Sequence, residues 1–368
     1  MKHWHNELNF TNTTALTDSI FSESSVFFDI ETTGFSPVNT SLYLIGCASR
    51  KGTTLFLDQF FAENPSEEKE VLSAFLQHIS SYRTILSFNG LGFDIPYLKG
   101  KCKTYEISDP FGSYDYVDIF KEVSRLKFLL KLENYKQKSI EKFLGIGRDD
   151  QFDGGQLIDV YQDYVKHPTD DAEHFLKLHN YEDVLGMTDL LSILSYSRFF
   201  HGDFSLQNIC TKTYENFDHT ETGEELFFSL ALDFPVPRKV SYRFEDCYLH
   251  LADDTATISV KIKNDTLKFF FPNYKDYFYL PDEDTAIHKS VAAFVDKEYR
   301  QKAKAANCYQ KKTGRFLPQY DEWITPAFRR EHKDKISYFE LTEDFLASET
   351  MLASYLKNLV HTFSIQKK

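Results

Sequence analysis

Residues 25–32, SVFFDIET, join an apolar run to two acidic side chains, and this combination constrains the fold more than any other feature of the sequence. The run predicts a buried strand that ends in a turn over residues 32–34. Side chains at positions i and i+2 share one face of a strand, so Asp29 and Glu31 point the same way. Free carboxylates are costly in a buried central strand. We therefore expect either a cation between these two acids or a strand end that faces solvent.

The order of apolar segments over residues 25–205 predicts an α/β domain with a mixed sheet flanked by helices. Residues 1–24 are polar and are expected to be a lead-in segment. Ser66 is a suitable N-cap for the first long helix, because acidic residues follow it at the positive end of the helix dipole. The expected strands are 25–30, 41–49, 53–61, 83–90 and 114–120, and the expected helices are 65–82, a segment with Pro96 in its first turn, parts of 121–145, and 170–199.

Residues 222–368 differ in character and predict a smaller α+β domain of unknown role. Short strands in series are expected over 239–271. A helix is expected from about 284 to 304 and a last helix over 343–362, because apolar residues recur there at helical spacing. The apolar stripe of the earlier helix comprises Ile287, Val291, Phe294 and Val295.

The composition is that of a soluble globular protein, with 42% hydrophobic and 26% charged residues among 368. A formal net charge of −13 excludes a basic coat over the whole surface, although a local basic stripe can still bind phosphates. The five cysteines lack CxxC spacing, so no disulfide framework or zinc site is expected, and a reducing cytoplasm fits best. We expect no signal peptide and no membrane association, since no stretch is apolar over the roughly 18 residues that a span needs.

Two further motifs carry acidic side chains that could join Asp29 and Glu31. Asp94 follows the turn FNGLG at the end of a predicted strand, where it can cap the next helix or hold a metal ion. His179 and Asp183 are four residues apart, so they lie on one face of a helix. The neighbouring Glu182 is a competing ligand, for which exposure to solvent is the expected outcome. Each motif alone has an ordinary structural explanation, and the ordered set is the stronger signal.

This ordered set resembles the DEDD superfamily of 3'–5' exonucleases, and its details are similar to the YprB-like bacterial branch. The resemblance rests on FFDIETTG, LYLIGC, FNGLGFDIPYL, YVDIF, SIEKFLGI and HNYEDVLGM, which follow the family's order over about residues 25–200. It implies a ribonuclease H-like fold for this part of the chain. It does not extend to the C-terminal domain.

The resemblance also implies roles for individual residues. Asp29, Glu31, Asp94 and Asp183 would hold two divalent ions, Mg²⁺ or Mn²⁺, and His179 would be the general base. Such hard cations prefer carboxylate oxygen, and a pair of them can activate water and stabilise the leaving 3' oxygen of a phosphodiester. His-type members usually place the histidine five residues before the last aspartate. Here the spacing is four, as in the Tyr-type branch.

Substrate contacts are expected at the turns beside these acids. The candidate substrate-binding residues are Thr32, Thr33, Gly34, Asn89 and Phe93. In the resembling family the first turn lies near the terminal nucleotide, whereas ordinary turn chemistry explains both segments equally well. Asp118 is expected to support the acids or to cap a helix rather than to bind metal.

These features together predict a metal-dependent 3'–5' exonuclease that acts on single-stranded DNA or RNA by a two-metal-ion mechanism. An endoribonuclease on structured RNA could use the same site, and a non-catalytic nucleic-acid-binding module could keep the fold. A basic run that includes Lys302, Lys304, Lys311 and Lys312 has two interpretations. It is either a phosphate-tracking surface of the C-terminal domain or the solvated face of a helix.

Overall fold

The structure is a computed structural model that describes residues 1–149, 154–215 and 222–365. It divides into two compact units, one of Met1–Phe199 with Phe234–Arg238 and one of Phe200–Asp233 with Lys239–Lys368. Part of the segment between the two predicted domains, residues 216–221, lies outside the described residues, as do residues 366–368 at the end of the second domain. No helix in the described parts of the chain has both the length and the apolar character needed to cross a membrane.

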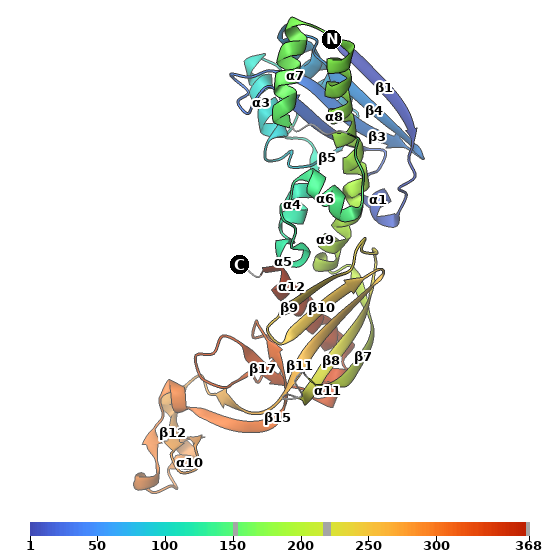
Figure 1. The fold of residues 1–368 in the computed structure, drawn as a ribbon. Coiled ribbons are helices and arrows are strands. Elements are labelled where there is room, and N and C mark those ends of the chain that lie inside the picture. The colour runs from blue at the N-terminus through green and yellow to red at the C-terminus, as the bar shows by residue number, and fades with distance from the viewer. Residues whose placement is uncertain (150–153, 216–221, 366–368) are drawn as a thin grey trace. The chain divides into compact units, whose positions relative to one another are not determined.

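Six strands of the first unit form one mixed sheet in the order β1-β4-β3-β2-β5-β6 (Figure 1). Neighbours from β1 to β2 pair antiparallel, whereas β5 and β6 run parallel to β2. The strands are β1 (Lys2–Asn9), β2 (Ser25–Thr32), β3 (Leu42–Lys51), β4 (Thr54–Phe61), β5 (Thr84–Ser87) and β6 (Asp115–Asp118). The predicted mixed α/β fold is confirmed, and the acidic strand β2 lies inside the sheet.

The N-terminal segment is the first departure from the prediction. Residues 1–24 are not a lead-in, because Lys2–Asn9 forms the edge strand β1 and Ala15–Ile20 forms helix α1. The strand was not recognisable as one, since its alternate side chains are half-buried or exposed and mostly polar. A polar edge strand of this kind discourages pairing with other chains.

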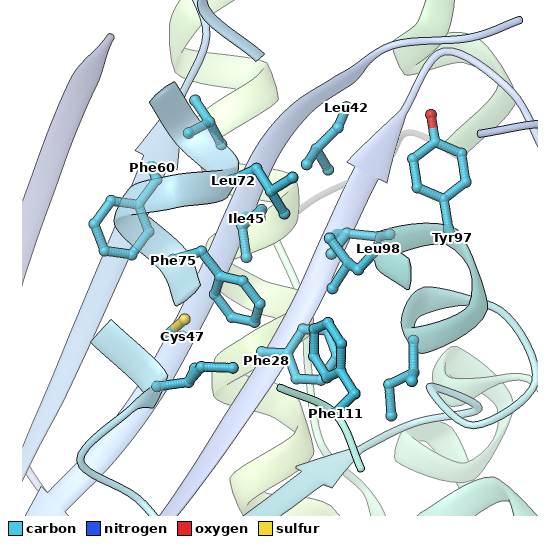
Figure 2. Close-up of a cluster of buried hydrophobic side chains, with 14 of the residues drawn as sticks. Phe28, Leu42, Ile45, Cys47, Phe60, Leu72, Phe75, Tyr97, Leu98 and Phe111 are labelled. Carbon is cyan, nitrogen blue, oxygen red and sulfur yellow. The ribbon is translucent and has the colours of Figure 1, made fainter. Parts of the chain in front are cut away.

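Helices cover both faces of this sheet. The helices of the first unit are α1 (Ala15–Ile20), α2 (Glu68–Ile79), α3 (Asp94–Thr104), α4 (Ile119–Ser124), α5 (Lys127–Leu130), α6 (Gln137–Leu144), α7 (Gly154–Lys166), α8 (Asp170–Leu190) and α9 (Leu194–His201). Helices α2 and α3 enclose one core, in which Phe28, Phe75 and Leu98 are buried (Figure 2). On the opposite face, α7 and α8 enclose a second core that includes Tyr43 and Tyr161.

Two predicted helix boundaries are wrong in detail. The helix expected over 170–199 ends at Leu190, and a 3₁₀ turn over Leu191–Ile193 separates it from α9. Ser66 is not an N-cap. Instead Asn64 accepts a hydrogen bond of 3.1 Å from the backbone N–H of Ser66 and caps a 3₁₀ turn that precedes α2.

The second unit is built on an eight-stranded sheet and a small three-stranded sheet. The long strand β11 pairs with β8 and β10 through its first half and with β15 and β16 through its second half. The strands of the second unit are β7 (Phe204–Glu215), β8 (Thr222–Leu232), β9 (Val240–Phe244), β10 (Cys247–Ala252), β11 (Thr255–Phe270), β12 (Tyr277–Leu280), β13 (Thr285–His288), β14 (Gln301–Lys302), β15 (Tyr309–Gln319), β16 (Phe328–Arg329) and β17 (Ser337–Glu340).

Three helices complete the second unit, namely α10 (Lys289–Ala292), α11 (Glu343–Ala347) and α12 (Glu349–Ile365). Helix α12 packs against the large sheet through contacts of Tyr355 with Phe228 and of Phe363 with Tyr242. The predicted strands over 239–271 and the last helix are present. The combination of sheet and helix agrees with the predicted α+β class.

The prediction of a helix from 284 to 304 is wrong. This segment instead contains β13, the four-residue helix α10 and β14, and both strands pair with β12. Helical spacing of apolar residues was not a sign of burial here, since Phe294 is 92% exposed and Val291 is 56% exposed. Strand pairing with β12, rather than the local spacing of apolar residues, determines the backbone conformation of this segment.

The basic run therefore does not lie on a helix face. Lys311 forms an ion pair with Asp284, and Lys312 forms one with Glu340. These acids offset part of the positive charge on which a phosphate-tracking surface would depend.

Candidate functional site

The two acids of β2 lie on the face of the sheet that α8 covers. Val26, Phe28 and Ile30 belong to the core against α2 and α3, so the alternating side chains of Asp29 and Glu31 point to the opposite face. Helix α8 contacts β2, β3 and β4 on that face. Both acids therefore meet the helix that carries His179 and Asp183.

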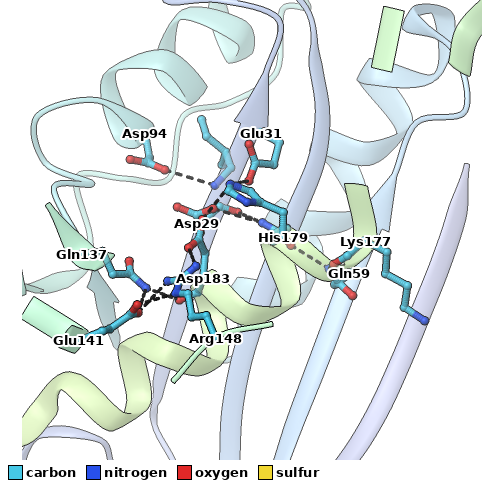
Figure 3. A network of polar contacts seen from close by, with 12 residues as sticks. Asp29, Glu31, Gln59, Asp94, Gln137, Glu141, Arg148, Lys177, His179 and Asp183 are labelled. Carbon is cyan, nitrogen blue, oxygen red and sulfur yellow. Dashed lines mark hydrogen bonds and ion pairs between the residues drawn. The ribbon is translucent and has the colours of Figure 1, made fainter. Parts of the chain in front are cut away.

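His179 and Asp183 lie one turn apart on α8, as predicted. The Nε2 atom of His179 is 3.2 Å from Oδ2 of Asp183 and 3.6 Å from Oε1 of Glu31 (Figure 3). One ligand atom from each of these three residues lies within 4.8 Å of the others. His179 is only 5% exposed, so the cluster is largely shielded from water. The competing Glu182 is used elsewhere, because it accepts a hydrogen bond of 3.0 Å from the backbone N–H of Asp149.

Asp94 reaches the same cluster from the first residue of α3. Its Oδ1 atom accepts a hydrogen bond of 3.3 Å from the backbone N–H of Ile30, which lies between the two acids of β2. The capping alternative for Asp94 is not what the structure shows, since the N-cap of α3 is Phe93 and it makes no side-chain cap bond. The carboxylate is bound to the neighbouring strand instead.

Asp118 holds the turn that precedes Asp94. Its two carboxylate oxygens accept hydrogen bonds of 3.0 and 3.1 Å from the backbone N–H groups of Asn89 and Leu91. It also caps α4 through the backbone N–H of Lys121. The predicted supporting and capping role of Asp118 is confirmed.

Burial and neighbouring carboxylates perturb the ionisation of Asp29 and Asp94. Burial, and then the charges of Glu31, Asp94 and Asp183, raise the pKa of Asp29 well above its usual range, while a hydrogen bond from Asn180 opposes the shift. Burial raises the pKa of Asp94 to about 7, and the nearby Asp118 and Asp183 contribute in the same direction. Asp29 and Asp94 therefore take up protons more readily than free carboxyl groups, and a bound cation would compete with those protons.

Gln59 and Asn180 form a chain of hydrogen bonds that ends on the carboxylate of Asp29. The side-chain N–H of Asn180 donates to Oδ2 of Asp29 at 3.2 Å, and Gln59 donates to the amide oxygen of Asn180 at 3.0 Å. Gly46 on β3 makes this approach possible, because a Cβ atom there would lie 2.2 Å from that amide oxygen. The sequence analysis missed Asn180 and Gln59. Only the position of Asn180 next to His179 could have pointed to it.

Arg148 holds Asp183 in a comparable way, and the sequence analysis missed it too. Its Nη1 atom lies 2.5 Å from Oδ1 of Asp183, and its Nε and Nη2 atoms lie 2.5 and 2.7 Å from the two oxygens of Glu141 (Figure 3). Gln137 on α6 donates to Glu141 and to the backbone carbonyl of Asp183. The sequence gives no sign of this contact, because Arg148 follows α6 and Asp183 lies on the distant helix α8.

The predicted substrate residues of the first turn are mainly engaged in shaping it. Thr32 donates to the carbonyl of Gly34 at 2.9 Å, and the hydroxyl of Thr33 accepts from the backbone N–H of Ser41 at 2.8 Å. Gly34 has φ +152°, and a Cβ atom there would lie 2.8 Å from the Thr40 side chain. The turn directly follows Glu31, so its outer surface lies beside the acids.

Asn89 and Phe93 belong to the turn before α3. Asn89 is exposed and has φ +64°, a left-handed conformation that asparagine tolerates. Phe93 is half-buried and packs edge-on against Phe35, with ring centroids 5.9 Å apart. Phe35 is 90% exposed, so the two turns that flank the acids present an aromatic surface to solvent.

The donor set suits a hard divalent cation. Asp29, Glu31, Asp94 and Asp183 supply carboxylate oxygens, which Mg²⁺ and Mn²⁺ prefer. Burial and, after it, neighbouring carboxylates raise the pKa values of Asp29 and Asp94, and a bound cation would offset both effects. The residues therefore fit the predicted ions.

A comparison with known protein families finds a model that matches most of the first unit. A family model described as the RNase_H superfamily matches residues 26–195. A search of curated proteins finds no match.

Solved structures provide more distant similarities. The family B DNA polymerase of the hyperthermophilic archaeon Pyrobaculum calidifontis is 18% identical over 46% of this chain and 25% of the polymerase, with a TM-score of 0.37. Exonuclease I of E. coli in complex with a dT13 oligonucleotide is 12% identical over 56% of this chain and 54% of the exonuclease, with a TM-score of 0.29. The chain thus spans about a quarter and about half of these two proteins. The family match and the mixed sheet flanked by helices identify residues 26–195 as an RNase H-like domain.

Proposed function

We propose that the RNase H-like domain is a metal-dependent nuclease that hydrolyses phosphodiester bonds of single-stranded nucleic acid from the 3' end. The observation that carries this proposal is the convergence of Asp29, Glu31, Asp94 and Asp183 from β2, α3 and α8 on one face of the sheet. We further propose that this centre is of the DEDD type, in its YprB-like bacterial branch. Glu31 and Asp94 are buried, and Asp29 and Asp183 are half-buried. Gathering this much negative charge in a shielded place is costly without a bound metal ion, which makes a purely structural role a poor explanation.

Two divalent ions, Mg²⁺ or Mn²⁺, are the proposed cofactors. When bound, they supply Lewis acidity that lowers the pKa of the attacking water and stabilises charge on the leaving 3' oxygen. Asp29 is close enough to Glu31, Asp94 and Asp183 to feel their charges, and these four acids together would hold the ions. Asn180 and Arg148 hold Asp29 and Asp183 in fixed orientations, so little reorganisation would be needed on binding.

His179 is the proposed general base. Its Nε2 atom faces Glu31 and Asp183, so a water molecule bound among these groups would lie within reach of it. An imidazole is a side chain that can accept the proton of such a water molecule.

The turns of Thr32, Thr33 and Gly34 and of Asn89 and Phe93 are the proposed contacts for the 3'-terminal nucleotide. The exposed ring of Phe35, which packs on Phe93, offers a surface on which a nucleobase can stack. Stacking of this kind tolerates any base, so it suits a nuclease without strong sequence preference.

The proposal is tested by comparing matched substrates with and without ends. A linear 5'-labelled single strand, the same strand closed into a circle, and an RNA hairpin are incubated with Mg²⁺ or Mn²⁺. A 3'–5' exonuclease shortens the linear strand stepwise and leaves the circle intact. Cleavage of the circle or the hairpin at internal positions indicates the endonuclease instead, and binding without any cleavage indicates a non-catalytic module.

A further inference from the structure

Arg148 bridges a buried carboxylate and one of the candidate metal ligands. Its guanidinium faces both oxygens of Glu141 through Nε and Nη2, and its Nη1 atom lies 2.5 Å from Oδ1 of Asp183. Glu141 is 1% exposed and lies against Gly186 of α8, where a Cβ atom would lie 2.4 Å from its Oε1. The segment after α6 is thus tied to α8 at the turn that carries Asp183.

Because of this contact, the two carboxylate oxygens of Asp183 face different groups. Oδ1 faces Arg148, whereas Oδ2 lies 3.2 Å from Nε2 of His179, on the side of Glu31. A carboxylate held at one oxygen cannot rotate about its last bond without breaking that hydrogen bond. The oxygen that remains is therefore directed at the group formed by Glu31, His179 and Asp183.

The charge of Arg148 is already offset by Glu141. A guanidinium binds a carboxylate with two parallel hydrogen bonds and keeps further N–H groups for a second acceptor. From the position of a cation beside Asp183, the Arg148–Glu141 pair is close to neutral. Replacing the pair would thus remove an orienting hydrogen bond and change the net charge of the site very little.

We propose that Arg148 is a positioning residue for metal binding, which orients Asp183 and is itself held by Glu141. This inference rests on the proposed function of the same site. Hydrogen-bond partners of metal ligands typically contribute about 10–100-fold to metal affinity or activity. We expect Arg148, which lies outside the sequence motifs, to make a contribution of this size to metal affinity.

Two other roles have to be distinguished from this one. Arg148 could act only as a clamp between α6 and α8, which would affect stability alone. It also lines a cavity of about 360 Å³ with Lys138 and Lys142, so it could bind a phosphate of the substrate directly. A role in substrate binding would raise KM and leave metal affinity unchanged.

The test measures Mn²⁺ binding by electron paramagnetic resonance in the absence of substrate. Arg148→Met combined with Glu141→Leu replaces the buried pair by apolar side chains of similar size, which is often neutral for stability. Arg148→Gln alone is the second variant, and near-UV circular dichroism checks the fold of both. Arg125→Ala is the matched control, since Arg125 pairs with Glu122 on the surface of the same unit at 3.1 Å.

We expect both Arg148 variants to bind Mn²⁺ about 10-fold or more weakly, with Arg125→Ala unchanged. In cleavage assays their kcat should fall and their KM should change little. If the double variant bound Mn²⁺ as tightly as the wild type, the proposal would be overturned. A loss of stability would then indicate a clamp between α6 and α8, and a higher KM would indicate substrate binding. Because Mn²⁺ binding is measured without substrate, this result stands even if the wild-type protein cleaves nothing, which would count against the proposed function alone.

Discussion

The side-chain amide of Asn180 donates a hydrogen bond of 3.2 Å to Oδ2 of Asp29, although Asn180 directly follows His179 on α8. Successive residues of a helix point about 100° apart, so α8 must lie very close to the sheet for both side chains to reach the acids. Gly46 permits that approach. One helix therefore supplies a candidate base, a candidate metal ligand and the group that orients the central acid.

Asn180→Ala should lower the cleavage rate and weaken Mn²⁺ affinity about 10–100-fold, because Asp29 would lose its orienting donor. Titration with Mn²⁺ and single-turnover cleavage of a labelled oligonucleotide measure the two effects. Asn358→Ala is the control, since that amide donates to a backbone carbonyl on α12 in the other unit. Wild-type behaviour of Asn180→Ala would show that Asp29 needs no such support.

Gly46→Ala should destabilise the first unit by about 1–3 kcal/mol, as expected for an overpacked core. The added Cβ would lie 2.2 Å from the Asn180 amide oxygen and 2.8 Å from the Val184 side chain. Gly112→Ala is the matched control, since its Cβ would meet nothing within 4 Å, and we expect a change within about 0.5 kcal/mol. Unfolding in urea measures both variants, and equal stabilities would contradict the close approach of α8 to β3.

The carboxyl group of Asp94 should contribute a loss of stability to the metal-free protein as the pH rises from about 4 to about 7. The pKa of Asp94 is raised from 3.8 to about 7 in the folded chain, so between these values the folded state binds more protons than the unfolded state. The free energy of unfolding then falls with increasing pH.

Chemical denaturation in EDTA at several pH values measures this slope. Asp94→Asn should show a shallower slope, and saturating Mg²⁺ should raise stability most at the highest pH. A slope that is the same in wild type and Asp94→Asn would contradict the buried, charge-repelled state of this carboxyl group.

His179→Ala should lower kcat by about 10²–10⁴-fold, the usual contribution of a general base. Its Mn²⁺ affinity should change far less, because the carboxylates supply the main ligands. His174→Ala, an exposed histidine on the same helix, is the control and should behave as wild type. If affinity and rate fell together, His179 would be a metal ligand rather than the base.

The parts of the site that follow a regular spacing could be predicted from the sequence. Asp29 and Glu31 share a face because a strand repeats every two residues, and His179 and Asp183 meet because a helix repeats every 3.6. The mixed sheet followed from the order of its apolar segments. The structure then brings Asp94 to the same face through the turn that Asp118 holds.

The supporting residues could not be predicted because they depend on contacts between distant segments. Arg148 lies outside any periodic element, and its partners are on α6 and α8. The edge strand β1 has only Trp4 and Leu8 among polar residues on its half-buried face, so its alternation of apolar residues is too weak to mark it. Phe294 shows the opposite error, since it fits a helical stripe and yet is almost fully exposed.

The most direct test is the hydrolysis of 5'-labelled single-stranded DNA and RNA by the wild-type protein, Asp29→Asn and Asp183→Asn. Each reaction is run with Mg²⁺, Mn²⁺ or EDTA, and circular dichroism confirms that the variants fold. We expect a metal-dependent ladder that shortens from the 3' end and is absent in both variants. Cleavage that persists in EDTA, or that equals the wild-type rate in either variant, would contradict a nuclease centre built on these acids.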